Sequence, residues 1–184
     1  MNRQERRVVQ KFAGKPRQSV PRAMPSGSAS LVAGLVAEAH RHHLASRFDE
    51  AEALCVRILE LDRNHAATWH RLGIIAHHRR RHAEAVELIG KAIALNEPEP
   101  TAHFNVGLAQ AALGRSDEAA IHYARAAALK PDYAEAHMNL GIILKSEGRF
   151  EEALARYDQA LAARPDFAQA HGNRGVALAG LGRL

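Results

Sequence analysis

The sequence predicts an all-α fold, a right-handed superhelical solenoid of helix-turn-helix repeats. Three observations support this: a period of 34 residues, small side chains that recur at fixed places within it, and a turn residue near its middle. Only 5% of the 184 residues are aromatic while 47% are hydrophobic, many of them alanine, and this composition favours close-packed helices over strands. An all-β fold is excluded on the same ground.

Five frames of this period align without an insertion, at residues 32–65, 66–99, 100–133, 134–167 and the truncated 168–184. The eighth and twentieth positions of the frames are small, which predicts that two helix backbones approach closely there. The residues are Ala39, Gly73, Gly107, Gly141 and Gly175 at the eighth position, and Ala51, Ala85, Ala119 and Ala153 at the twentieth.

The fifteenth position predicts a turn between the two helices of each frame. Glycine, which occupies it in the last three frames, tolerates the left-handed backbone that ends a helix. The position reads Ser46, Arg80, Gly114, Gly148 and Gly182. Prolines near the frame ends stop the second helix, because proline cannot continue one. These are Pro98, Pro131 and Pro165.

The strings WHRLG (69–73), HMNLG (137–141) and GRFEEA (148–153) resemble the tetratricopeptide repeat (TPR) family, whose pattern runs W-x-x-L-G-x-x-Y and then A, F, A and P. The resemblance covers 32–184. The first frame departs from the pattern with Glu38 and Cys55 where large apolar residues are usual, as expected of a terminal cap.

The fifth frame ends at Leu184, where its second helix would begin. Half a repeat would leave apolar side chains such as Leu178 and Leu181 without a packing partner. We therefore expect the natural polypeptide to continue beyond Leu184.

Residues 1–29 are predicted to be a flexible basic tail. The first 30 residues hold seven of the 25 Lys and Arg but one of the 20 Asp and Glu, and the proline-rich composition buries too little surface to offset the entropy of ordering. The rest of the chain is nearly neutral, so no specific nucleic acid is expected as a partner. Anchoring of the tail to RNA or lipid is permitted but not specified, and a secretory signal is a further alternative, although the apolar stretch 29–37 fits the first repeat helix better.

Positions 2, 6, 9 and 13 of each first helix share the stripe opposite the partner helix, and the family resemblance implies that this stripe lines a concave groove. Its sixth position is Asn105, Asn139 and Asn173 in the last three frames. Carboxamides spaced about 10 Å apart can pair with the N–H and C=O groups of an extended peptide. This ladder is similar to that of O-linked N-acetylglucosamine transferases. The alternative is that the asparagines bond neighbouring carbonyls or water.

In the first two frames the same stripe carries His40, Arg71 and His78. These residues predict a preference for acidic peptide that strengthens as imidazoles protonate below about pH 6.5. A solvated polar face is the alternative.

No metal, cofactor or catalytic site is predicted. His78 and His82 straddle a predicted turn, and histidines that share the fourth position lie about 10 Å apart, too far to hold one ion. The latter are His103, His137 and His171. Cys55 is expected in the core. No phosphate-binding loop, nucleotide motif or nucleophile with a positioned base is present, so the chain is predicted not to be an enzyme.

Two hypotheses of function follow. The first is a protein-protein interaction module that binds a partner segment in extended conformation. A clamp for a terminal carboxylate is not expected, because no lysine stands at the fifth position of the preceding frames. The second is a region that presents substrates to a transferase in a larger polypeptide, either of the O-GlcNAc type or a methyltransferase or sulfotransferase. A cytoplasmic location without membrane contact is expected from the single cysteine and from the lack of an apolar run of roughly 18 residues.

Overall fold

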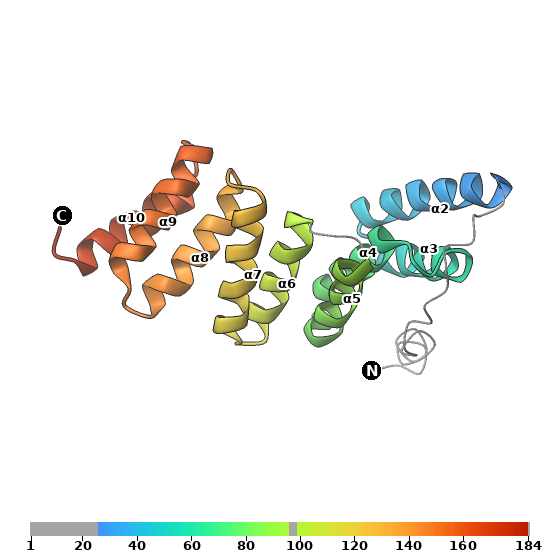
Figure 1. Cartoon of the computed structure of the whole chain (residues 1–184), viewed down its shortest axis with the longest axis horizontal. Helices are drawn as coiled ribbons and strands as arrows, with labels where there is room; N and C mark the ends of the chain where they lie inside the picture. The colour runs from blue at the N-terminus through green and yellow to red at the C-terminus, as the bar shows by residue number, and fades with distance from the viewer. Residues whose placement is uncertain (1–25, 96–98, 184) are drawn as a thin grey trace. The chain divides into compact units, whose positions relative to one another are not determined.

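The computed structural model describes residues 26–95 and 99–183, and all regular structure in these ranges is helical (Figure 1). The chain divides into two compact units, residues 1–95 and 96–184. The first unit contains α2 (Ser26–Leu44), α3 (Phe48–Leu61), α4 (Ala66–His78) and α5 (His82–Leu95). The second contains α6 (Pro100–Ala112), α7 (Ser116–Leu129), α8 (Ala134–Ser146), α9 (Phe150–Ala163) and α10 (Ala168–Gly180). The predicted all-α fold of repeated helix pairs is confirmed.

The helix bounds follow the predicted period. The first helices α4, α6, α8 and α10 each begin at the first residue of a frame, and α3, α5, α7 and α9 each begin at the seventeenth. Helix α2 differs because it starts at Ser26, ahead of Val32, where its frame begins. Residues 26–29, which composition assigned to the tail, are therefore helical. The rest of the predicted tail and Pro98 lie outside the described residues.

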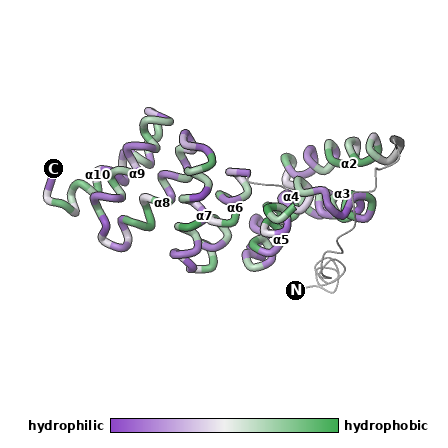
Figure 2. Tube along the Cα trace, viewed as in Figure 1, coloured by the Kyte–Doolittle hydropathy of each residue, from purple (hydrophilic) through white to green (hydrophobic). Residues whose placement is uncertain are grey.

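Within each unit, consecutive helices pack against one another. Helix α3 lies against both α2 and α4, and α4 packs on α5. In the second unit the series from α6 to α10 packs in order, and α10 also touches α8. Hydrophobic and hydrophilic residues alternate along the helices (Figure 2), so that each helix buries one side.

Small residues lie where the helices of a pair meet, as predicted. The four alanines of the twentieth position are all 0% exposed. A Cβ added to Gly141 would lie 2.5 Å from Cε1 of Tyr157, and one added to Gly107 would lie 2.6 Å from Cε1 of Tyr123. The missing side chain at the eighth position therefore makes room for a large residue of the second helix.

The predicted turns are also confirmed. The fifteenth residue has a positive φ in all five frames. The N–H of the next residue donates to a carbonyl in the last turn of the first helix, as from Arg149 to Leu144 at 3.0 Å, which is the hydrogen bond of a Schellman motif. The φ angles are 55° at Ser46, 61° at Arg80, 74° at Gly114, 77° at Gly148 and 66° at Gly182.

The fourth position of a first helix fastens the turn between frames, a role that the sequence did not predict. Nε1 of Trp69 donates to the carbonyl of Arg63 at 2.8 Å. Nε2 of His137 lies 2.9 Å from the carbonyl of Pro131, and His171 makes the same contact with Pro165 at 2.8 Å. Because a carbonyl only accepts, these ring nitrogens carry the hydrogen.

Candidate functional site

The three predicted asparagines lie at equivalent places on α6, α8 and α10, and each is half-buried. Leu108 and Ile142, each three residues after an asparagine, are half-buried as well. Residues three apart on a helix are neighbours on its surface. We call these five residues the position-six face, which combines amide and aliphatic groups within the second unit.

Asn173 already makes hydrogen bonds inside the protein. The Nζ of Lys145, on α8, donates to its Oδ1 at 2.7 Å, and its Nδ2 donates to the carbonyl of Gln169 at 3.0 Å. For this residue the structure therefore shows bonds to neighbouring groups of the protein, as in the alternative that the asparagines bond neighbouring carbonyls or water. A carboxamide has two N–H groups and two lone pairs, so Asn173 keeps one of each, and the ammonium of Lys145 keeps two N–H groups.

Lys145 adjoins this face through Asn173, and sequence reasoning did not identify it. It stands at the twelfth position of its frame, outside the stripe that helical angles assign to the groove, yet it reaches the sixth position of the following frame. The contact joins residues 28 apart and depends on how α8 and α10 pack, so no pattern within one frame signals it.

In the first unit, the structure brings two of the three predicted basic residues together. Nη1 of Arg71 lies 2.8 Å from Nδ1 of His40. A guanidinium only donates, so the imidazole nitrogen accepts. His78 lies elsewhere: its ring stacks on Phe48, with centroids 5.5 Å apart and planes 12° apart, and it meets His43 edge to face.

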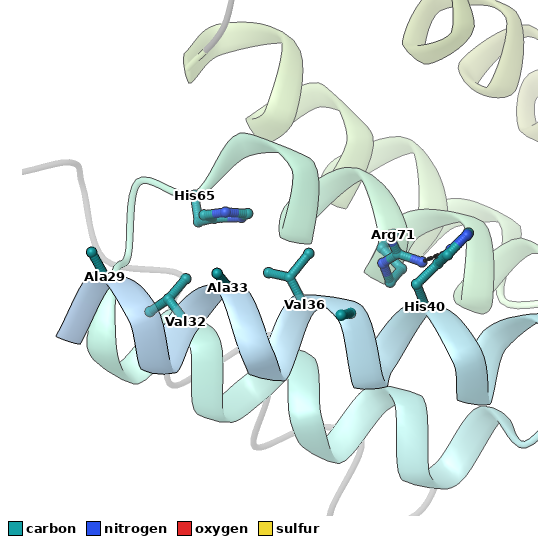
Figure 3. A pocket seen from close by; sticks show the side chains of 8 residues that line it. Ala29, Val32, Ala33, Val36, His40, His65 and Arg71 are labelled. Carbon is teal, nitrogen blue, oxygen red and sulfur yellow. Dashed lines mark hydrogen bonds between the residues drawn. The ribbon is translucent and has the colours of Figure 1, made fainter. Parts of the chain in front are cut away.

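The Arg71–His40 pair forms one end of a groove of about 570 Å³ along α2 (Figure 3). Apolar side chains of α2, among them Ala33 and Val36, line its length, and His65 faces them from the segment before α4. None of the described residues that line it is acidic. The predicted stripe includes Ala37, His40 and Arg71 of this lining, but the apolar floor that Ala29, Val32 and Val36 add was not predicted.

Two histidines of the first unit, His43 and His77, have a lowered pKa. Burial, followed by the nearby positive Arg71 and by His78 and His40, lowers the pKa of His43. Burial and the adjacent His82, whose Nδ1 is 3.2 Å from that of His77, lower the pKa of His77. These two histidines therefore gain their charge at a lower pH than free histidine does.

The remaining candidates give no sign of chemistry. Cys55 is 0% exposed, as predicted for a core residue, and burial raises the pKa of its thiol to about 12. Across residues 26–95 and 99–183, no three His, Cys, Asp or Glu side chains gather closely enough to hold a metal ion. In the same ranges, no helix combines the length and apolar character that crossing a membrane requires.

These features define a class of protein, a solenoid of helix pairs with variable residues on one stripe. A tetratricopeptide repeat model matches residues 36–100 and 84–134, and a TPR repeat model matches 143–182. The chain belongs to the tetratricopeptide repeat family. Its fold and family are those of protein-interaction scaffolds.

Solved structures agree with this assignment. A crystal structure of MamA matches with a TM-score of 0.74 and 24% identity over 83% of each chain. YrrB, a TPR protein with an unusual peptide-binding site, matches with a TM-score of 0.70 and 23% identity over 81% of this chain and 77% of its own. A mutant O-GlcNAc transferase of Thermobaculum terrenum matches with a TM-score of 0.68 and 26% identity over 79% of this chain but 28% of its own. No curated protein sequence matches.

Proposed function

We propose that the chain is a protein-interaction module whose position-six face binds a segment of a partner protein in extended conformation. The observation that carries this proposal is the recurrence of half-buried asparagine at one structural position on α6, α8 and α10. Packing does not require an amide at this position, since the first unit has Ala37 and Arg71 there. A peptide main chain is the ligand that repeated carboxamides suit, because each offers a donor and an acceptor.

The face has two kinds of contact to offer. Asn139 and the remaining groups of Asn173 can pair with main-chain N–H and C=O groups, while Leu108 and Ile142 offer aliphatic surface between them. Lys145 adds N–H donors and a positive charge at the end of α8, which favours carbonyl oxygens or a carboxylate there. YrrB, which shares the fold, has a peptide-binding site, and this is compatible with the proposal.

The test uses peptides selected from a random dodecapeptide library displayed on phage, with the full chain as bait. We expect the triple variant Asn105→Ala, Asn139→Ala and Asn173→Ala to lose about fivefold or more in affinity for the selected peptides, since two or three hydrogen bonds of about 0.5–1.5 kcal/mol are removed. Asn64→Ala is the matched control, because Asn64 is exposed in a turn outside this face.

Equal affinities of the parent chain and the triple variant, with helicity unchanged, would remove the asparagines from the binding site. Selected peptides that bind the parent chain but not the triple variant would support main-chain recognition. Selected peptides that share no side-chain motif would support it further, because amide pairing does not distinguish side chains.

A second candidate is a substrate-presenting region of a larger transferase. The match to the Thermobaculum terrenum O-GlcNAc transferase, of which it spans 28%, favours it over the other transferase types. The gene sequence after the codon for Leu184 tests this candidate. A reading frame that continues into a sugar-nucleotide-binding domain would support it, and a stop codon within one further helix would contradict it.

A further inference from the structure

The groove along α2 is a second surface that the position-six face does not use. It lies wholly within the first unit and is formed by α2, the segment before α4, and α4 itself (Figure 3). Its volume of about 570 Å³ falls within the roughly 300–1,000 Å³ of typical ligand sites. The start of α2 at Ser26 matters here, because it places Ala29 in the groove lining ahead of the first frame.

The floor of the groove consists of short apolar side chains. Ala29, Ala33 and Ala37 are exposed and Val36 is half-buried, and they follow one another at helical spacing on the same side of α2. Methyl groups offer water no hydrogen bond, so covering them with apolar side chains stabilises a complex. The floor therefore suits small aliphatic side chains that can approach the helix closely.

Arg71 gives the groove a charged end. Its guanidinium is half-buried and donates to His40, and among the described residues no carboxylate pairs with it. The other half-buried arginines of this unit differ, since Arg79 and Arg81 both lie within 3.4 Å of Glu52. A guanidinium has five N–H donors in a fork that matches a carboxylate, so an acidic group is the complement that this end lacks.

The length of the floor sets the length of the ligand. The twelve residues from Ala29 to His40 span about 16 Å, since the eleven steps between them each rise about 1.5 Å, and an extended chain covers this with about five residues at about 3.3 Å each. The charged end is not closed, because His40 is exposed, so a bound chain can continue past Arg71.

The charge of the groove also selects among occupants. Residues 1–25 of this chain carry seven Lys and Arg and a single acid, Glu5, which does not complement Arg71. The end of the groove beyond His40 is open, so a bound chain need not terminate at Arg71. The geometry therefore points to a side-chain carboxylate within a continuous segment.

We propose that this groove binds an extended segment of a partner protein in which small aliphatic residues adjoin an aspartate or glutamate, whose carboxylate pairs with Arg71. This inference rests on the proposed function in that the ligand is a partner segment. It assigns that segment's acidic and aliphatic part to a site that is separate from the asparagines.

The probes are two fluorescein-labelled, C-terminally amidated peptides, GSAVAVEGS and its reversed arrangement GSEVAVAGS, titrated with the full chain by fluorescence polarisation. We expect one of them to bind at least tenfold more tightly than its counterpart with glutamine in place of glutamate. The Arg71→Gln variant should lose this difference. The Ala37→Glu variant should lose binding altogether, because it fills the groove and places an acid beside Arg71.

Two variants serve as controls. Ala53→Glu adds the same charge at an exposed alanine of α3 outside the groove and should bind as the parent chain does. The triple asparagine variant should also retain the probe. If it loses the probe while Arg71→Gln keeps it, the peptide binds at the position-six face, and this inference fails while the proposed function stands.

Other outcomes would overturn the inference. They are failure of both probes to bind, equal binding of the glutamine peptides, or binding that requires a free C-terminal carboxylate instead of the glutamate. A concentration-dependent dimer in sedimentation that Arg71→Gln or Ala37→Glu dissociates would show that a second copy of the chain, and not a partner peptide, occupies the groove.

Discussion

The two units build the same turn from different residues. In the second unit the left-handed position is glycine, with φ of 74° at Gly114 and 77° at Gly148, whereas the first unit places Ser46 and Arg80 there with φ of 55° and 61°. The hydrogen bond that closes the turn is the same, 2.8 Å from Arg81 to Ala76 and 3.0 Å from Arg149 to Leu144. Helix packing and these hydrogen bonds therefore determine the backbone conformation of the turn, and the residue type changes only the free energy needed to adopt it.

The units also differ on their stripes. In the first unit an apolar helix face ends at Arg71, and in the second the same position presents asparagine with Lys145 beside it. The sixth position is Ala37, Arg71 or asparagine in the same kind of helix pair, so its chemistry can differ between units while the scaffold stays the same. Substitutions at scaffold positions measure how far this separation of scaffold from surface extends.

The largest effect is expected where scaffold packing is tightest. The Gly141→Ala variant should lose about 2 kcal/mol of unfolding free energy, since its Cβ would lie 2.5 Å from the Tyr157 ring and overpacking costs typically 1–3 kcal/mol. Gly175→Ala is the matched control at the same frame position, where a Cβ meets nothing within 4 Å. It should be stabilising by up to about 1 kcal/mol through helix propensity. Urea unfolding followed by helicity measures both, and equal effects would refute the assigned contact.

The fourth-position hydrogen bond should matter more in the first unit than in the second. Trp69→Phe removes the bond to Arg63 and part of a buried ring, and we expect a loss of about 1.5 kcal/mol. His137→Phe should lose less, because it also removes a buried Nδ1 that has no partner among the described residues. Both are measured by helicity, since Trp69 is the sole tryptophan and its fluorescence is lost with it. A larger loss for His137→Phe would contradict this ranking.

Exchange of the turn residues should produce opposite shifts of smaller size. Gly148→Ala should destabilise by about 1 kcal/mol, because a left-handed residue with a Cβ costs roughly 1–2 kcal/mol while the unfolded chain loses some entropy. Arg80→Gly should stabilise by about 0.5 kcal/mol for the converse reason. The added Cβ at Gly148 meets nothing within 4 Å, so the effect reports backbone conformation alone. Shifts of the same sign in thermal unfolding would disprove it.

The smallest effect is a dependence on pH. Burial lowers the pKa of His122, and burial with the charges of His122 and Arg125 lowers that of His103, below the ordinary 6.5. Between these lowered values and pH 6.5 the unfolded chain binds more protons than the folded one, so stability is complete above about pH 6.5 and falls as the pH drops below it. We expect a lower melting temperature at pH 5.5 than at pH 7.5, and a smaller difference in His122→Gln. A difference that His122→Gln leaves unchanged would assign the dependence to other groups.

The scaffold was predictable from the sequence because its determinants are local and repeat. In four frames the first residue of the frame is also the first residue of a helix, at Ala66, Pro100, Ala134 and Ala168. The fifteenth residue adopts the left-handed backbone of the turn even where it is Ser46 or Arg80. Helical periodicity places the small residues of a frame on one face of each helix, and the two helices of a pair pack closely through these faces.

Contacts between side chains of different frames were decided only by the tertiary structure. Lys145 meets Asn173 and Arg71 meets His40 across about 30 residues, while His78 turns to Phe48 instead of joining its predicted neighbours. The groove likewise needs the early start of α2 and the approach of α4. A repeat pattern states which face a residue occupies, but the distance and angle between packed helices determine which long, flexible side chains come within hydrogen-bonding range.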